Sequence, residues 1–275
     1  MPQWLVPIGR IFYAIGLIGI GVQHFIFADF IPVMVPSFPS WIPGRLFWAY
    51  AFGAALIAAG AAILFGVRAR TVAAVSGAVI LMLVVVDDVP GQLAANPGHL
   101  GVWTNTFKAL TMCGGAWVVA GSLKDQTSNI TRHLERLMPL GRYFLPITVI
   151  VFGIDHFLYT DFVASLVPSW IPGALFWTYF AGVALIAAGM GMILGIHARL
   201  ASLMLGIMIL LWLLMLHIPR AIADPHSAKG NEWTSVFEAL AFSGIAFMLA
   251  ALPASNPLSI SSSNKPAAVS KAHSA

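Results

Sequence analysis

The segment "PGRLFWAYAFGAALIAAGAAILFGVRAR", at residues 43–70, returns in mid-chain as "PGALFWTYFAGVALIAAGMGMILGIHAR", at residues 172–199. Two further segments recur on either side of it and in the same order. They are "GRIFYAIGLIGIGVQHFIFADF" from Gly9 with "GRYFLPITVIVFGIDHFLYTDF" from Gly141, and "WTNTFKALTMCGG" from Trp103 with "WTSVFEALAFSGI" from Trp233. Repeats of this kind indicate a duplicated structural unit. The sequence therefore predicts a tandem duplication over residues 5–121 and 137–251.

The composition is that of a membrane protein. Hydrophobic residues make up 59% of the chain and charged residues only 9%, whereas soluble domains carry about 25% charged residues. Several apolar stretches reach the roughly 20 residues that a helix needs to cross a bilayer. The single cysteine, Cys113, excludes a disulfide framework, a CxxC redox pair and a cysteine zinc site within one chain. The partner that follows is a lipid bilayer.

Each copy contains four apolar stretches. Their length favours helices over the short, alternating strands of a membrane barrel. Because four is an even number, both copies enter the membrane from the same side. The predicted fold is an all-α integral membrane protein with eight transmembrane helices, arranged as two parallel tandem four-helix modules. The predicted spans are residues 5–28, 45–66, 71–89, 104–121, 143–160, 174–195, 200–218 and 233–251.

The basic residues predict the orientation. Of the 14 lysines and arginines, ten lie on the side of the two termini and four on the other side, and basic loops stay in the cytoplasm. Their place in short loops also argues against nucleic acid as a partner. We expect a bacterial inner-membrane protein with both termini cytoplasmic. The predicted division is a first module at 1–121, a cytoplasmic linker at 122–141, a second module at 142–252 and a disordered cytoplasmic tail at 253–275.

The hexapeptide "PSWIPG" occurs at residues 39–44 and again at 168–173. Proline has no N–H to leave unsatisfied, and it disfavours a helix in the residue before it. Tryptophan is a residue type that anchors at the membrane interface. The motif therefore predicts the same corner twice, ahead of the second span of each module, with Trp41 and Trp170 at the outer surface.

Polar residues inside the predicted spans gather at one depth. Ionisable residues there are costly, so each one indicates a functional site. The second module contributes Asp155, His156, His217 and Glu238, and the first contributes Gln23, His24, Asp88 beside Asp87, and Lys108. All are expected in the outer third of the bilayer.

The pairing of these charges is open from the sequence. Asp88 can pair with Lys108 and His217 with Glu238, or Lys108 can pair with Glu238 across the two modules. On the structural interpretation the pairs neutralise one another and hold helices together.

On the functional interpretation, imidazoles and carboxylates carry protons or bind a metal. A histidine beside a carboxylate titrates near neutral pH, so the catalytic candidates are His217, Glu238, Asp155 and His156. The charged pair of the first module, Asp88 with Lys108, is then mainly structural. No local motif indicates a metal site. The candidates for cofactor contacts are Trp177, Tyr179 and Trp233, whose alternative role is to face lipid.

The order "GR…HF…DF…VPxWIPG…LFWxY…ALIAAG…GxxAR…P…W…F…AL" resembles the DoxX-like membrane proteins. That group of four-helix modules includes the small subunit type associated with thiosulfate:quinone oxidoreductase. The resemblance covers nearly all of both modules and implies a quinone-linked redox subunit. A quinone would be its cofactor, and a redox partner protein would carry the redox centre. The sequence also allows a small-solute or ion transporter, or a membrane scaffold without turnover.

Overall fold

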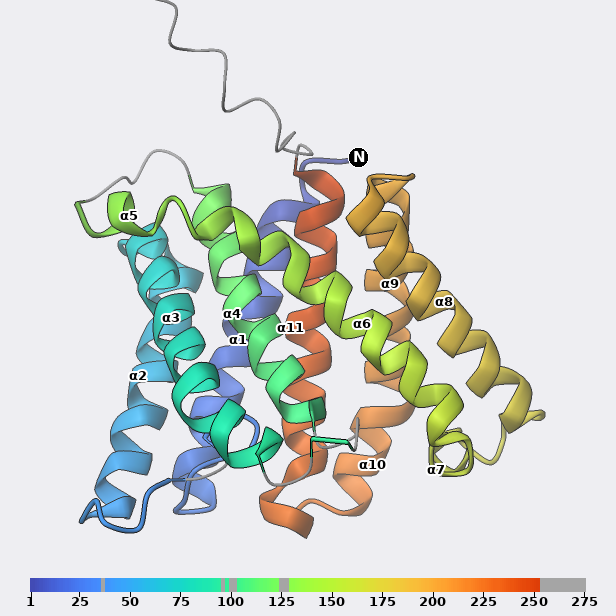
Figure 1. The fold of residues 1–275 in the computed structure, drawn as a ribbon, viewed down its shortest axis with the longest axis horizontal. Helices are drawn as coiled ribbons and strands as arrows, with labels where there is room; N and C mark the ends of the chain where they lie inside the picture. Colours follow the sequence, from blue (N-terminus) through green and yellow to red (C-terminus); the bar gives the residue numbers. More distant parts are fainter. Residues whose placement is uncertain (36–37, 95–96, 99–102, 124–128, 253–275) are drawn as a thin grey trace, which may run out of the picture.

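The structure is a computed structural model that describes residues 1–35, 38–94, 97–98, 103–123 and 129–252. Within these ranges every regular element is a helix. The helices form a bundle in which the chain begins, and the last helix ends, at the same end (Figure 1). We call this the termini end, and the opposite end the α10 end. The predicted tail and residues 124–128 of the predicted linker lie outside the described ranges.

The predicted helices are confirmed to within a few residues. The long ones are α1 (Leu5–Ile26), α2 (Arg45–Phe65), α3 (Ala69–Leu83), α4 (Thr104–Ser122), α6 (Gly141–Leu158), α8 (Ala174–Leu194), α9 (Ala198–Trp212) and α11 (Asn231–Ala251). The short ones are α5 (Asn129–Leu134), η3 (Met138–Leu140), α7 (Thr160–Leu166), α10 (Ile218–Ala223) and η5 (Ser227–Lys229), with two π-helical segments, η1 (Val84–Leu93) and η4 (Leu213–His217).

Seven helices in the described part of the chain are long and apolar enough to cross a membrane. They are Leu5–Ile26, Arg45–Phe65, Ala69–Asp87, Met138–Leu158, Ala174–Leu194, Ala198–Ala223 and Ser227–Ala251. Helix α4 is not among them, although it has the position and length that the sequence predicts. Twelve of its 19 residues are buried. Eight spans therefore remain a prediction.

The packing order places α4 and α11 in the middle of the bundle. Helix α11 packs against α1 and α9, and α4 packs against α3 and α6. Helix α1 also packs against α2, and α6 against α8. Figure 1 shows α2 and α3 on one side of the two central helices and α8 and α9 on the other. The first helix of each predicted module thus contacts the last helix of the other.

Glycines allow these central contacts. A Cβ atom added to Gly244 would lie 2.6 Å from the carbonyl oxygen of Gly9, and one added to Gly114 would lie 2.6 Å from that of Gly141. At such distances only a residue without a side chain lets two backbones approach. The α1–α11 and α6–α4 crossings therefore have the same close contact at corresponding positions.

The predicted corners are also built alike. The Ile42 N–H donates to the Pro39 carbonyl at 3.2 Å, and the same bond closes the second copy at 2.9 Å. The final glycines, Gly44 and Gly173, have φ angles of 76° and 77°. This left-handed conformation is readily adopted only by glycine, and here it starts α2 and α8. The recurrence of the motif thus has a backbone reason.

The segments that follow α1 and α6 differ. After α1 the chain turns into the bundle, and most of the side chains between residues 30 and 35 are buried; we call residues 30–35 the plug. The buried side chains are Phe30, Ile31, Val33, Met34 and Val35. The matching segment of the second half forms α7, in which no residue is buried. Phe162, the counterpart of Phe30, is 65% exposed.

Candidate functional site

An ion pair lies in the interior near the α10 end. The Nζ atom of Lys108, on α4, is 2.9 Å from Oε2 of Glu238, on α11, and the two side chains are only 18% and 3% exposed. The pair joins the two central helices. Of the pairings that the sequence left open for Glu238, the structure therefore contains the one with Lys108. The predicted pairing of Lys108 with Asp88 involves a side chain outside the described residues.

His217 lies in the π-helical segment η4. Its Nδ1 atom is buried and has no hydrogen-bond partner within the described residues. The charged groups that act on the ring are Lys108, Glu232 and Arg220. No hydrogen bond joins His217 to Glu238 among the described residues. His217 therefore lies beside the interior charges without completing the predicted histidine–carboxylate pair.

The π-helical segments η1 and η4 occupy matching places in the two halves. Pro90 lies within η1, and Pro219 is the second residue of α10, the helix that directly follows η4. Proline cannot donate to the helical ladder and its ring displaces the preceding turn, which explains why the helices widen there. Segments of this kind frequently mark functional sites. Asp87 and His217 project from them.

A second ion pair fixes the start of α11. The guanidinium of Arg220, on α10, donates from Nε at 3.0 Å and from Nη2 at 2.6 Å to the two carboxylate oxygens of Glu232. This two-point geometry is the strongest that arginine makes with a carboxylate. It holds α10 against α11 on the side where His217 lies.

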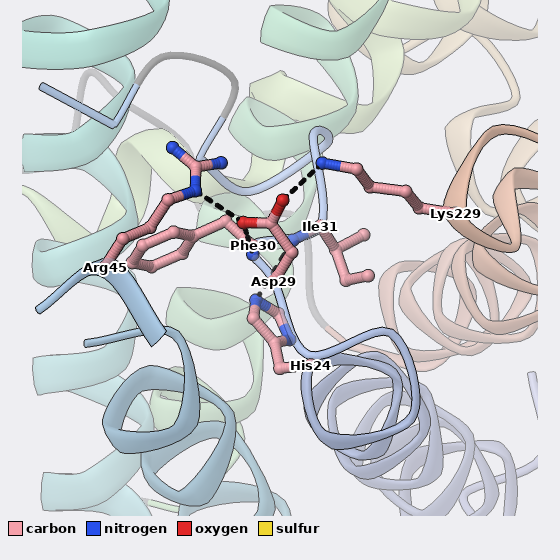
Figure 2. Close-up of polar contacts among 6 residues, drawn as sticks. All are labelled: His24, Asp29, Phe30, Ile31, Arg45 and Lys229. Atoms are coloured by element: carbon pink, nitrogen blue, oxygen red, sulfur yellow. Dashed lines mark hydrogen bonds and ion pairs between the residues drawn. The ribbon is translucent and has the colours of Figure 1, made fainter. Parts of the chain in front are cut away.

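Asp29 joins the two halves at the α10 end (Figure 2). Its Oδ1 accepts from Nε of Arg45 at 2.7 Å and from the Phe30 N–H at 2.8 Å, and its Oδ2 accepts from Nζ of Lys229. The Arg45 guanidinium also lies 5.6 Å from the centre of the Phe30 ring. Asp29 was not among the residues predicted from the sequence. The signal that could have identified it is an acidic residue on the side opposite the termini, which has only four basic residues.

The pKa of Asp29 reflects its partners. Partial burial acts to raise it, but the hydrogen bonds from Arg45 and Lys229 outweigh burial and lower the pKa from 3.8 to about 2. Between about pH 2 and pH 4, the unfolded chain therefore binds more protons at Asp29 than the folded chain does. The stability that Asp29 contributes is complete above about pH 4 and is lost as the pH falls through about 2.

We therefore expect Asp29→Asn to lower the unfolding temperature at neutral pH and to have progressively less effect as the pH falls from about 4 to about 2. Thermal unfolding of both proteins in detergent, across this pH range, measures the difference. Asp161→Asn is the control, because it changes the corresponding aspartate of the second half, which is exposed. A difference between Asp29→Asn and the unchanged protein that stays constant with pH would contradict the assignment.

His24 and His156 occupy matching places but have different surroundings. His24 is fully buried; its Nδ1 bonds to the Ile20 carbonyl at 2.8 Å and its Nε2 accepts from the Ile31 N–H at 3.4 Å. Figure 2 shows the ring of His24 below the plug. His24 therefore fixes the plug to α1, and both of its ring nitrogens are used.

His156 repeats only half of this pattern. Its Nδ1 bonds to the Phe152 carbonyl at 2.7 Å, and its ring stacks on Trp212 at 6.2 Å. No donor to its Nε2 is present among the described residues. Asp155, beside it on α6, is partly exposed. The four predicted catalytic residues thus come from three elements, α6, η4 and α11, and Glu238 is paired with Lys108 in the interior.

The aromatic candidates lie on two different helices. Trp177 and Tyr179 are about half exposed on α8, and Tyr179 stacks on Phe157. Trp233, on α11, stacks on Phe237 with their ring centres 6.3 Å apart. Trp233 also lines an apolar groove with a volume of about 300 Å³, which runs between α1 and α11. It is lined by Gly19, Val22, Gln23, Ile26, Phe27, Pro225, His226, Trp233 and Phe237.

Gln23 connects this groove to the backbone of the second half. Its side-chain N–H donates to the Gly230 carbonyl at 3.0 Å, and its carbonyl accepts from the Thr234 hydroxyl at 3.2 Å. Over the described residues, no group of three or more His, Cys, Asp or Glu residues is placed to hold a metal ion. The groove therefore combines an apolar lining with the hydrogen-bonding amide of Gln23.

Residues 145–254 match a family model described as a domain of unknown function (DUF8561). The match begins in α6 and ends just beyond α11, so it covers the second half of the bundle and less than half of the chain. No curated protein and no solved structure matches the chain.

Proposed function

We propose that the chain is an integral membrane protein of two parallel four-helix modules, with α4 as the eighth span. Supporting this are the seven apolar helices and the matched glycine contacts of the α1–α11 and α6–α4 crossings. Helix α4 begins with polar residues, Thr104, Asn105, Thr106 and Lys108, which lower its mean hydropathy. Because α4 is largely enclosed by other helices, it does not need a lipid-facing apolar surface. It corresponds in place to α11.

We assign the modules to residues 1–121 and 142–252, with both termini and the linker at 122–141 in the cytoplasm of a bacterial cell. The support is the excess of basic residues on the side of the termini. Trp41 and Trp170, both well exposed near the α10 end, would then anchor at the outer interface.

This orientation predicts the labelling of new cysteines. Ser128→Cys should react with a membrane-impermeant maleimide only after the cells are opened, whereas Ser40→Cys should react in intact spheroplasts. The natural cysteine, Cys113, is buried and gives a low background. Labelling of position 128 in intact spheroplasts, with no labelling of position 40, would show that the chain has the opposite topology.

We further propose that the protein is a quinone-linked redox subunit, in which the Lys108–Glu238 pair handles protons for a quinone bound in the groove between α1 and α11. The observation that carries this proposal is the position of Glu238 directly after Phe237, a groove residue. Adjacent residues of a helix point about 100° apart, so Phe237 lines the groove while Glu238 turns toward Lys108 on α4. An ammonium and a carboxylate in contact can pass a proton between them, and such groups cluster at functional sites.

The resemblance to the DoxX-like proteins motivates the choice of a quinone. Reduction of a quinone takes up electrons and protons together. The chain has no cysteine pair, so the electrons would come from a redox partner protein. The stacked rings of Trp233 and Phe237 offer an aromatic surface to a quinone ring.

Quinone binding is tested on protein purified in mild detergent. We expect quinone in the lipid extract and quenching of tryptophan fluorescence by a short-chain quinone. Trp233→Phe should remove most of the quenching. Trp103→Phe is the matched control, because Trp103 stacks on Phe107 at the corresponding place in the first half. Absence of quinone from the extract, together with equal quenching in both variants, would exclude this site.

A transporter is the second candidate. The observation that favours it is that the Lys108–Glu238 pair joins the two central helices, one from each module. In such a protein the modules would rock against each other around a shared site. Solute flux in proteoliposomes under a proton gradient distinguishes the two candidates. A transporter should give flux, whereas a redox subunit should give no flux. A scaffold should give neither flux nor quinone binding.

A further inference from the structure

The surroundings of His156 can be compared directly with those of His24, because the same helix crossing holds both. A Cβ atom on Gly21 would lie 2.7 Å from the Gly53 carbonyl oxygen, and one on Gly153 would lie 2.8 Å from that of Gly182. Helix α8 therefore sits on α6 as α2 sits on α1. Residues at matching positions of α2 and α8 face the histidine of their own half.

His24 is enclosed by aromatic rings and by backbone. The ring of Phe52, on α2, meets it edge-on at 5.4 Å, and the ring of Phe30 meets it at 6.2 Å. The Ile31 N–H donates to its Nε2. The plug and Phe52 thus satisfy the imidazole fully, and no room or bonding capacity is left for another molecule.

His156 lacks these three neighbours. Ala181 takes the place of Phe52 on α8, and Phe162, the counterpart of Phe30, is turned outward. Helix α7 lies outside the bundle, so no N–H reaches the Nε2 of His156. One new ring is present, because Trp212 replaces Leu83 and stacks on the imidazole.

The Nε2 of His156 is a hydrogen-bond acceptor, because Nδ1 faces a carbonyl and must carry the proton. The Nε2 atom is not fully enclosed by protein, so a donor can approach it from outside the bundle, and few donors are present in a membrane. We propose that His156, Trp212 and Ala181 form a binding site for a phenol-class molecule, an apolar compound with a hydroxyl on an aromatic ring. The hydroxyl donates to Nε2, and the ring takes the place that Phe52 fills in the first half. This site is separate from the groove at Trp233 and does not rest on the proposed function.

The test uses the full chain in detergent and 4-butylphenol as the probe. Protein labelled with ¹⁵N in histidine reports the Nε2 resonance of His156, which is assigned by its loss in His156→Gln. Addition of the phenol is expected to shift this resonance in a saturable manner. 4-Butylanisole has the same ring and chain but no hydroxyl donor, so it should leave the resonance in place.

Ala181→Phe should weaken phenol binding about tenfold or more, because the new ring fills the site as Phe52 does in the first half. The unfolding temperature should be kept, since a ring is already accommodated at the matching crossing. Val183→Phe is the control: it adds the same bulk to α8 at a side chain that is 59% exposed, and phenol binding should be unchanged.

Three results would overturn the proposal. The anisole could shift the Nε2 resonance as the phenol does, or Ala181→Phe could bind the phenol as tightly as the unchanged protein. The Nε2 resonance could also be hydrogen-bonded already in lipid nanodiscs without the probe, in which case water or a lipid headgroup is the donor.

Discussion

Replacing Lys108 with methionine is expected to lower the free energy of unfolding by about 3–5 kcal/mol, the usual cost of removing one partner from a buried ion pair. The cost is high because Glu238, only 3% exposed, would keep a carboxylate in the interior without its cation. Thermal and denaturant unfolding in detergent measure the loss. Lys229→Met is the control, because Lys229 is 45% exposed and Asp29 retains Arg45; its cost should stay below about 1 kcal/mol.

The double variant Lys108→Met with Glu238→Leu separates charge from packing. Replacement of a buried ion pair by apolar residues of similar size is often neutral or stabilising. We therefore expect the double variant to recover most of the stability lost in Lys108→Met, while any proton-dependent activity is lost. The ion pair would not be buried as described if Lys108→Met costs no more than Lys229→Met.

The second large effect is expected at the two glycine contacts. Gly9→Val and Gly141→Val should each destabilise the bundle by about 1–3 kcal/mol or more, because the added side chains would press on the backbone of α11 or α4. Unfolding in detergent gives the comparison. Gly121→Val is the control, since a Cβ atom there has no neighbour within 4 Å. A large loss for one glycine and none for the other would mean that the two crossings are not equivalent.

The helices were predictable because their signal is local. Length, apolarity and the turn residues Gly44, Gly66, Gly173 and Gly195 define them, and all four glycines have the left-handed conformation that ends or begins a helix. The packing order was not predictable from the same signal. That α1 contacts α11 depends on which small residues meet, and pairs such as Gly9 with Gly244 are 235 positions apart.

The candidate site was predictable in its residue types but not in its partnerships. Glu238 was found because a carboxylate inside an apolar helix is conspicuous, yet its partner depended on how α4 and α11 pack. The plug was not predictable from the repeat. The first half has three extra residues at 36–38, and Leu83 is replaced by Trp212 in the second half. These changes give two nearly repeated segments different structures.

Redox-difference infrared spectroscopy can detect a change in the protonation of Glu238 during the proposed function. The protein is reconstituted with a short-chain quinone, which is reduced and reoxidised electrochemically, and the carboxyl region of the spectrum is compared with that of Glu238→Gln. We predict a carboxyl band that changes when the quinone is reduced and that is missing in the variant. Identical difference spectra for the two proteins would mean that Glu238 exchanges no proton with the quinone, and would contradict a proton-handling role for the Lys108–Glu238 pair.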